Sequence, residues 1–147
     1  MIIIRLWHYE LIPYLDKQRL VAQWRECCCI AKNIADNGTP NHLLVNEVLN
    51  YPTIHFVEYT NMILKEMNER GYKVNEKSYL NFCENIRKGQ SYFHDKYNNS
   101  VIINNQVLWH DDIYLKICLY NLYEKALCGG ISQEEWNIIE NKFKEYF

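Results

Sequence analysis

A chain of 147 residues, 48% of them apolar and 23% charged, has the size and composition of one globular domain, which excludes a fibrous or intrinsically disordered protein. The sequence therefore predicts a single domain over residues 1–147. Its 16 Lys and Arg against 18 Asp and Glu leave a formal charge of -2. Because the whole molecule carries no excess positive charge, any affinity for nucleic acid or for an anionic membrane has to come from a local patch.

No apolar run approaches the roughly 18 residues that a membrane span needs, and the apolar start of the chain gives way at once to Arg5. We therefore expect a cytoplasmic protein with no membrane partner. The cysteines lack the C-x-x-C spacing of zinc and redox sites, which predicts free, mostly buried thiols. The histidines are scattered and no glycine-rich phosphate loop occurs, so the sequence predicts no metal and no cofactor. The six cysteines are Cys27, Cys28, Cys29, Cys83, Cys118 and Cys128.

The clearest helix is expected over residues 16–35, where apolar residues recur every three or four positions. Asp16 is suited to cap its start, and Asn37-Gly38 is suited to end it. A shorter helix is expected over residues 42–49.

Pro52 is suited to open the next helix, which should run to a stop near Arg70. The stretch that follows mixes Lys, Asn and aromatic residues without a clean period. A short helix over residues 76–87 fits its first part. A small β-hairpin near 101–109 fits its last part, because Asn residues at its centre tolerate the positive φ of tight turns.

Two further helices are expected near the C-terminus. Asp111 and Asp112 can cap a helix that ends at Gly129, and Ser132 with Glu135 has the spacing of a capping box for the last helix. The predicted fold class is therefore mainly α, and the hairpin would be its one β element.

A helical wheel for residues 16–35 places three charged side chains, Arg19, Arg25 and Glu26, on or beside its outward face. Ordinary surface ion pairs explain this arrangement as well as a binding site does, because such pairs are common and contribute only about 0–1 kcal/mol. Periodicity alone leaves the two interpretations open.

The N-terminal sequence resembles that of a known family. Matching segments run from Arg5 to Leu15, through Trp24-Arg25-Glu26-Cys27-Cys28, and on to Met67-Asn68-Glu69-Arg70-Gly71-Tyr72, with a further likeness at His110-Asp111-Asp112. These segments are similar to the pyrimidine-dimer DNA glycosylase (bacteriophage endonuclease V) family, and most similar to its short phage and bacterial members that begin Arg-Leu-Trp-His. The resemblance implies a compact, mainly helical single domain.

The resemblance also implies a catalytic pair. In the family's glycosylases the N-terminal α-amine attacks the sugar C1′ of a damaged nucleotide and forms an imine, after which the strand is cleaved by β-elimination. That role falls to the amine of Met1. An α-amine suits this chemistry because its pKa of about 7.7–8.0 leaves more free base at neutral pH than a lysine does. The glutamate that holds the sugar and moves protons matches Glu26.

Four further residues are candidate ligand contacts. The resemblance places Arg5 and Arg25 on phosphates, where a planar bidentate donor is favoured. Arg19 is added because of its helix face and charge, and His8 because it lies in the matching motif. The expected partner is damaged DNA or a small nucleotide.

Two features keep an alternative open. Met1 to Ile4 precede Arg5, whereas the family places its amine directly before the arginine, and the net charge of -2 is low for a protein that grips a duplex. A catalytically silent nucleotide-binding protein of the same fold, for example a phage protein that sequesters a small nucleotide signal, fits both features. An adaptor that binds only other proteins has no positive sign in the sequence.

Overall fold

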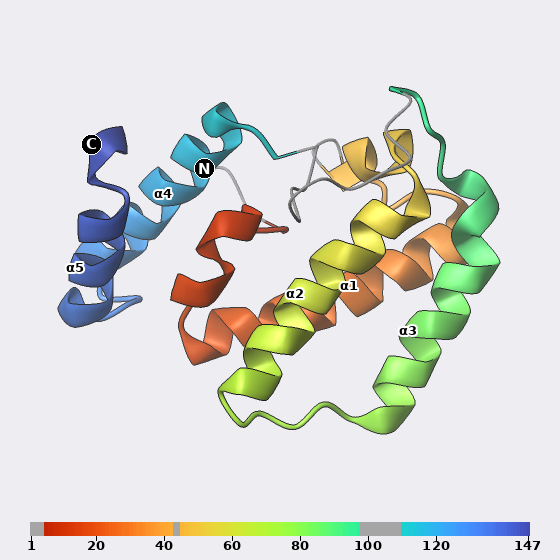
Figure 1. The fold of residues 1–147 in the computed structure, drawn as a ribbon, viewed down its shortest axis with the longest axis horizontal. Coiled ribbons are helices and arrows are strands. Elements are labelled where there is room, and N and C mark those ends of the chain that lie inside the picture. Colours follow the sequence, from red (N-terminus) through yellow and green to blue (C-terminus); the bar gives the residue numbers. More distant parts are fainter. Residues whose placement is uncertain (1–4, 43–44, 98–109) are drawn as a thin grey trace.

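The computed structural model describes residues 5–42, 45–97 and 110–147, and all regular structure within these ranges is helical (Figure 1). The mainly α fold class is confirmed, whereas the hairpin expected near 101–109 lies outside the described residues. The elements in chain order are η1 (Tyr9–Tyr14), α1 (Lys17–Asn37), η2 (Val45–Asn50), α2 (Thr53–Glu69), α3 (Glu76–Gly89), η3 (Gln90–Tyr92), α4 (Asp112–Leu127), α5 (Gln133–Lys142) and η4 (Lys144–Tyr146), where η denotes a 3-10 helix.

Helix α1 has the ends that the sequence predicts. The Asp16 carboxylate accepts a hydrogen bond from the Arg19 backbone N–H at 3.3 Å. At the other end Gly38 adopts a left-handed φ of 76° and donates its N–H to the Ile34 carbonyl. The face between these caps packs into the core through a stripe of buried residues: Leu20, Gln23, Trp24, Cys27, Ile30, Ala31 and Ile34.

Two short segments that precede α2 have a different secondary structure from the one predicted. Residues Tyr9–Tyr14 form the 3-10 helix η1, which the sequence analysis did not predict, and the region expected as a helix over 42–49 forms the 3-10 helix η2 instead. A 3-10 helix is short and lacks the 3.6-residue repeat, so the pattern that reveals an α-helix is absent. The ring of Pro13 lies within η1, where 3-10 bonding tolerates it.

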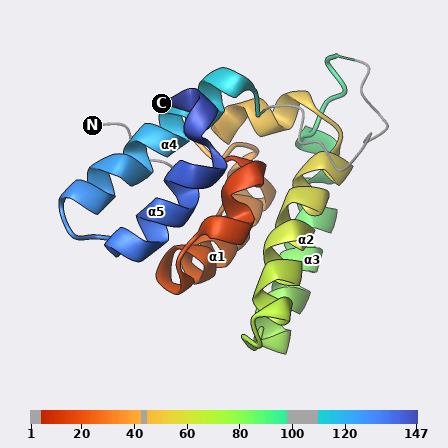
Figure 2. The same cartoon turned by 60° about the vertical axis from the view of Figure 1, so that its left-hand side comes forward.

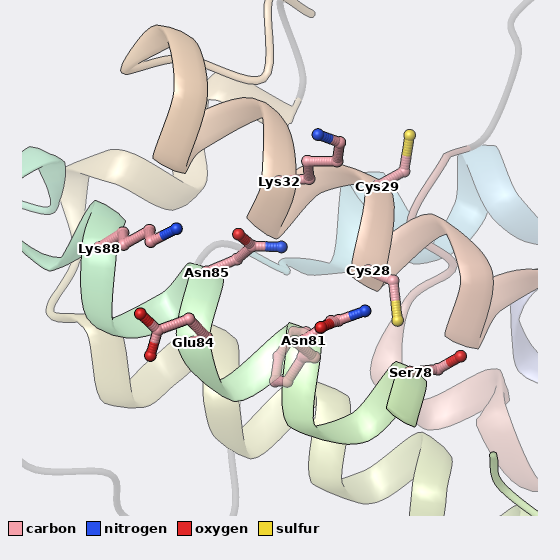
Figure 3. Close-up of a pocket in the computed structure, with 9 residues that line it drawn as sticks. Cys28, Cys29, Lys32, Ser78, Asn81, Glu84, Asn85 and Lys88 are labelled. Carbon is pink, nitrogen blue, oxygen red and sulfur yellow. The ribbon is translucent and has the colours of Figure 1, made fainter. Parts of the chain in front are cut away.

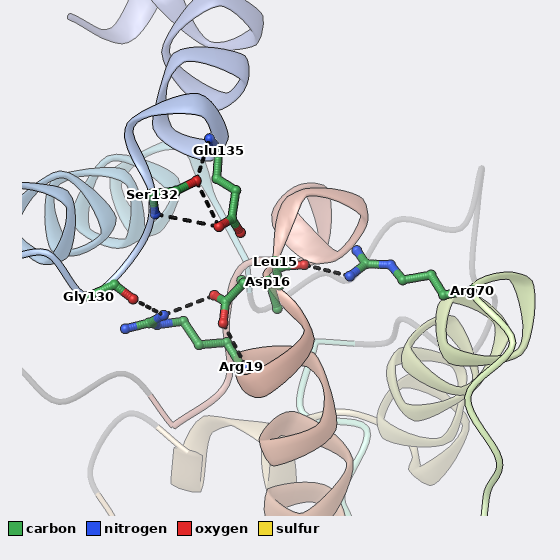
Figure 4. Close-up of polar contacts among 7 residues, drawn as sticks. All are labelled: Leu15, Asp16, Arg19, Arg70, Gly130, Ser132 and Glu135. Atoms are coloured by element: carbon green, nitrogen blue, oxygen red, sulfur yellow. Dashed lines mark hydrogen bonds and ion pairs between the residues drawn. The ribbon is translucent and has the colours of Figure 1, made fainter.

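Helix η1 lies between the α4–α5 pair on one side and α2 on the other (Figure 1). Arg70, at the end of α2, holds η1 in place: its guanidinium donates to the Leu15 carbonyl at 2.7 Å (Figure 4). It also donates to the Pro13 carbonyl at 3.0 Å. Glu66, one turn earlier, pairs with the same guanidinium at 3.3 Å. The chain segment that leads into α1 is therefore anchored from α2.

The C-terminal helices join this frame at the start of α1. Arg19 pairs with Asp16 at 2.9 Å and donates to the Gly130 carbonyl at 3.2 Å, so it links α1 to the turn between α4 and α5 (Figure 4). The predicted capping box is confirmed, since Ser132 and Glu135 bond each other reciprocally at the start of α5. In Figure 2, α4 and α5 lie on one side of α1, and α2 and α3 lie on the other.

Helices α1 and α3 approach each other closely at Gly89. A Cβ at this position would lie 2.9 Å from the Ile34 side chain and 3.3 Å from the Ala35 backbone nitrogen, so only glycine fits without a shift. Gly89 therefore allows the end of α3 to approach α1 closely.

The thiols are free, as expected, but they are not mostly buried. Cys27 and Cys118 are buried and Cys28 is half-buried, whereas three others are exposed: Cys29, Cys83 and Cys128. Burial depends on which helix face meets a neighbour, and the run of three cysteines on α1 spans both faces. Within the part of the chain that the structure describes, no helix has the length and apolar character required to cross a bilayer.

Candidate functional site

The most prominent polar contact between the N-terminal segment and α1 joins two of the candidate residues. The Arg5 guanidinium bonds the Glu26 carboxylate through both of its oxygens, Nη2 to Oε1 at 2.9 Å and Nε to Oε2 at 3.3 Å. The side chains are 18% and 30% exposed, so the pair lies at the surface with one edge open to solvent. The hydrogen bond that Arg5 donates to Glu26 raises the pKa of Arg5, which keeps the guanidinium charged.

Arg5 is held in this position through its backbone. The Gln23 side chain, buried on the inner face of α1, donates to the Arg5 carbonyl at 2.6 Å and accepts from the Trp7 N–H at 2.7 Å. Tyr59 of α2 donates its hydroxyl to the Trp7 carbonyl at 2.6 Å. Tyr114 of α4 donates to the Leu6 carbonyl. Three helices thus anchor residues 5–7 beside Glu26.

The sequence analysis missed these anchoring residues. Gln23 had a detectable signal, because it is a polar residue in the middle of an apolar helical stripe, and a buried amide there needs partners. Tyr59 and Tyr114 had none, because their hydroxyls reach the N-terminal segment only after α2 and α4 have packed. Nothing local marks a tyrosine as a backbone anchor.

His8 lies in the core and not at the open edge of the Arg5–Glu26 pair. It is only 3% exposed, stacks on the His110 ring at a centroid distance of 4.9 Å, and accepts a hydrogen bond from the Glu10 N–H at 3.2 Å. His110 in turn accepts from the Tyr9 N–H at 3.0 Å. These contacts tie η1 to the start of α4, so the structure gives His8 a packing role, and its expected ligand contact stays a prediction.

Burial lowers the pKa of His8 to about 4. Since an unfolded histidine takes up its proton near pH 6.5, the folded state binds this proton less readily, and the stability that neutral His8 contributes is fully present above pH 6.5 and lost as the pH falls toward 4. The loss should reach about 3 kcal/mol. An NMR titration of the imidazole resonances checks this, and a His8 midpoint near 6.5 would contradict the buried placement.

The structure separates the remaining candidates. Arg25 precedes Glu26 on α1, is exposed, and forms no ion pair with any described residue. Arg19 is engaged by Asp16 and Gly130, so it stabilises the start of α1 in this structure. Met1 lies outside the described residues. Among the described candidates, the geometry therefore joins only Arg5 and Glu26, and Arg25 is next to Glu26 in sequence.

A metal role has no support among the residues described. Within 5–42, 45–97 and 110–147, no three His, Cys, Asp or Glu side chains gather closely enough to hold a metal ion. The Arg5–Glu26 pair offers a guanidinium and a carboxylate, groups that suit a phosphate-bearing substrate and proton transfer.

Comparison with known families decides the classification. The sequence model of the pyrimidine dimer DNA glycosylase family matches residues 4–80, more than half of the 147-residue chain. The chain belongs to this family. No curated protein gives a significant match, and no solved structure does either.

Family membership supplies the function at a coarse level, which is that of a DNA glycosylase-like protein with DNA as its partner. The matched range contains Arg5, Gln23, Arg25, Glu26 and Tyr59. Helix α4, which supplies another anchor of the N-terminal segment, lies beyond that range.

Proposed function

We propose that the protein is a DNA glycosylase that releases a damaged base and then cleaves the strand as an abasic-site lyase. The observation that carries the proposal is the Arg5–Glu26 pair at the surface of this protein. The Gln23 side chain holds the Arg5 backbone in place, and we call this contact the backbone clamp. A surface ion pair needs no such support to form, and by itself it adds little stability. The clamp is better explained by a need to keep Arg5 and Glu26 in one geometry.

The proposed reaction uses the N-terminal amine as nucleophile. The amine of Met1 attacks C1′ of the damaged nucleotide, the bond between C1′ and the base nitrogen breaks, and the base leaves with its electron pair and a proton. The bond between C1′ and the ring oxygen then breaks as the nitrogen lone pair forms the imine, and the ring oxygen keeps the electron pair and takes up the second proton of the amine. Removal of a C2′ proton then expels the 3′ phosphate by β-elimination. Glu26 is the proposed group that moves protons in these steps.

Arg5 has unused hydrogen-bonding capacity for this task. A guanidinium carries five N–H groups, and Glu26 takes two of them, through Nε and Nη2. No other residue that the structure describes accepts a hydrogen bond from the rest of the fork, which leaves these N–H groups for a phosphate. Arg5 would then bridge the phosphate and the carboxylate, which fixes the distance between the DNA backbone and the proton-transfer group.

Arg25 supports the same proposal. Its exposed guanidinium forms no ion pair with the residues that the structure describes, stands next to Glu26 in sequence and adds a second cation to the middle of α1. A local pair of arginines reconciles phosphate binding with a net charge of -2, because the field at the site depends on nearby charges and not on the total.

The test is base release and imine trapping with the full chain. We expect it to break the glycosidic bond of one pyrimidine of each dimer in UV-irradiated duplex DNA. We call this step base release, although the freed base stays joined to its neighbour through the dimer. We expect borohydride to link the protein permanently to abasic DNA, because borohydride reduces the imine. Mass spectrometry of the trapped peptide should place the link on the amine of Met1. Undamaged duplex serves as the control. Absence of both base release and trapping would overturn the proposal, and a link on a lysine would overturn the role of Met1.

A further inference from the structure

A groove runs between α1 and α3 and belongs to none of the interactions described above (Figure 3). Its volume is about 440 Å³. This falls within the roughly 300–1,000 Å³ of small-molecule binding sites. Nine residues line it: Cys28, Cys29, Lys32, Ser78, Asn81, Phe82, Glu84, Asn85 and Lys88.

The α3 wall presents polar groups that have no protein partner. The amides of Asn81 and Asn85, one helical turn apart, make no hydrogen bond to any residue that the structure describes, and Lys88 makes no ion pair there. In Figure 3 these three side chains reach from α3 toward α1. Glu84 also lines the groove, but it is already paired at 2.5 Å with Arg87, which is not among the lining residues. The available groups are therefore two amides and a cation.

The α1 wall and the floor complete the groove. Lys32 adds a second ammonium at the rim, where it pairs with Asp36 at 3.0 Å with both side chains more than half exposed, so an incoming anion can compete for it. Phe82 is 4% exposed and belongs to the core, and with half-buried Cys28 it gives the groove an apolar base. The groove is thus apolar below and hydrogen-bonding at its sides, with cations at one end.

The groove adjoins the Arg5–Glu26 pair. Cys29, on its α1 wall, follows Glu26 by one helical turn. Along α1 the order is therefore Glu26, Cys29, Lys32. A ligand in the groove would lie next to whatever occupies the open edge of Arg5.

We propose that the α1/α3 groove binds one nucleotide unit, with the base between the two helices and the phosphate at Lys32 and Lys88. Each asparagine amide offers a donor and an acceptor, which is the complement of a base edge, and the apolar base of the groove suits a ring. The two ammonium groups suit a phosphate. The nucleotide is either a free molecule or part of an unpaired strand that continues from the Arg5–Glu26 site. The proposal does not rest on the glycosylase chemistry.

The native cysteines give a direct test, because one exposed thiol lines the groove and two exposed thiols do not. The full chain is alkylated with iodoacetamide, and mass spectrometry follows Cys29, Cys83 and Cys128 separately. The probes are deoxyadenosine monophosphate and an undamaged single-stranded deoxyadenylate tetramer. At a probe concentration ten times its Kd, we expect alkylation of Cys29 to slow about tenfold while Cys83 and Cys128 keep their rates.

Variants of groove residues test whether the protection of Cys29 comes from binding in the groove. Asn85→Ala and Lys88→Gln should each abolish most of the protection, whereas Lys77→Gln, a matched exposed lysine of α3 outside the lining, should leave it intact. The variants at Asn85 and Lys88 change exposed or half-exposed side chains, so they should fold normally.

The outcomes distinguish a free nucleotide from an unpaired strand, and they test the groove proposal separately from the glycosylase proposal. Protection by the mononucleotide supports a free nucleotide, and protection by the tetramer alone supports a strand. No protection by either probe, or equal slowing at Cys83 and Cys128, would overturn the groove proposal even in a protein that cleaves damaged DNA. Protection without base release would instead leave the groove proposal standing and count against the glycosylase.

Discussion

Replacing Glu26 with glutamine is expected to lower the rate of base release from UV-irradiated duplex DNA by about 10²–10⁴-fold, because glutamine cannot move a proton. Glutamine keeps the shape of glutamate and its carbonyl can still accept a hydrogen bond from Arg5. Stability should therefore fall by no more than about 1 kcal/mol, as expected for a partly exposed ion pair. Single-turnover rates and urea unfolding of the variant measure the two effects.

Glu69→Gln is the matched control, because Glu69 is an exposed glutamate at the end of α2 and takes no part in the site. Its rate of base release should equal that of the natural chain. If Glu26→Gln retains the natural rate, or if it unfolds the protein, then Glu26 has a structural role and the proposed site is misplaced.

The second large effect concerns Gln23, which we expect to be a positioning residue. Gln23→Met keeps the length of the side chain but removes its amide, so the Trp7 N–H and the Arg5 carbonyl lose their partner in the core. Each unsatisfied buried group costs about 1–3 kcal/mol, so the free energy of unfolding should fall by about 2–5 kcal/mol. For a chain of this length, that corresponds to a Tm lower by roughly 5–15 °C.

A second measurement separates positioning from stability. At a temperature where Gln23→Met is fully folded, base release per folded molecule should still be reduced, because Arg5 no longer has a fixed distance to Glu26. An exclusively structural role would lower the Tm and leave that rate unchanged. The control is Gln18→Met on the exposed face of α1, which should alter stability by no more than about 0.5 kcal/mol.

The buried network around the N-terminal segment also explains why the helices outside the matched range matter. Tyr114 bonds the Leu6 carbonyl, and His110 stacks on His8, so the start of α4 supports the same residues that Gln23 clamps from α1. The family match ends at residue 80, yet the position of Arg5 depends on contacts made by residues 110 and 114.

Much of the architecture was predictable from local patterns. The caps at Asp16, Gly38 and Ser132 and the apolar stripe of α1 follow from rules that involve residues within a few positions of one another, and these features are confirmed. The placement of Glu26 outside the apolar stripe follows from the same periodicity. The family resemblance, carried by residues between Arg5 and Tyr72, is confirmed by the match to residues 4–80.

The sequence by itself therefore determined the helical fold class, the helix ends and the family, because each depends on short-range spacing or on motif identity. Only the tertiary structure decided that Arg5 pairs with Glu26, 21 positions away in the sequence, that Arg19 donates to the Gly130 carbonyl, and that His8 is buried. It also decided that Cys29 is exposed on a groove shared with α3. The physical reason is that helical periodicity says which face is apolar, whereas the packing of distant segments decides which side chains meet on it.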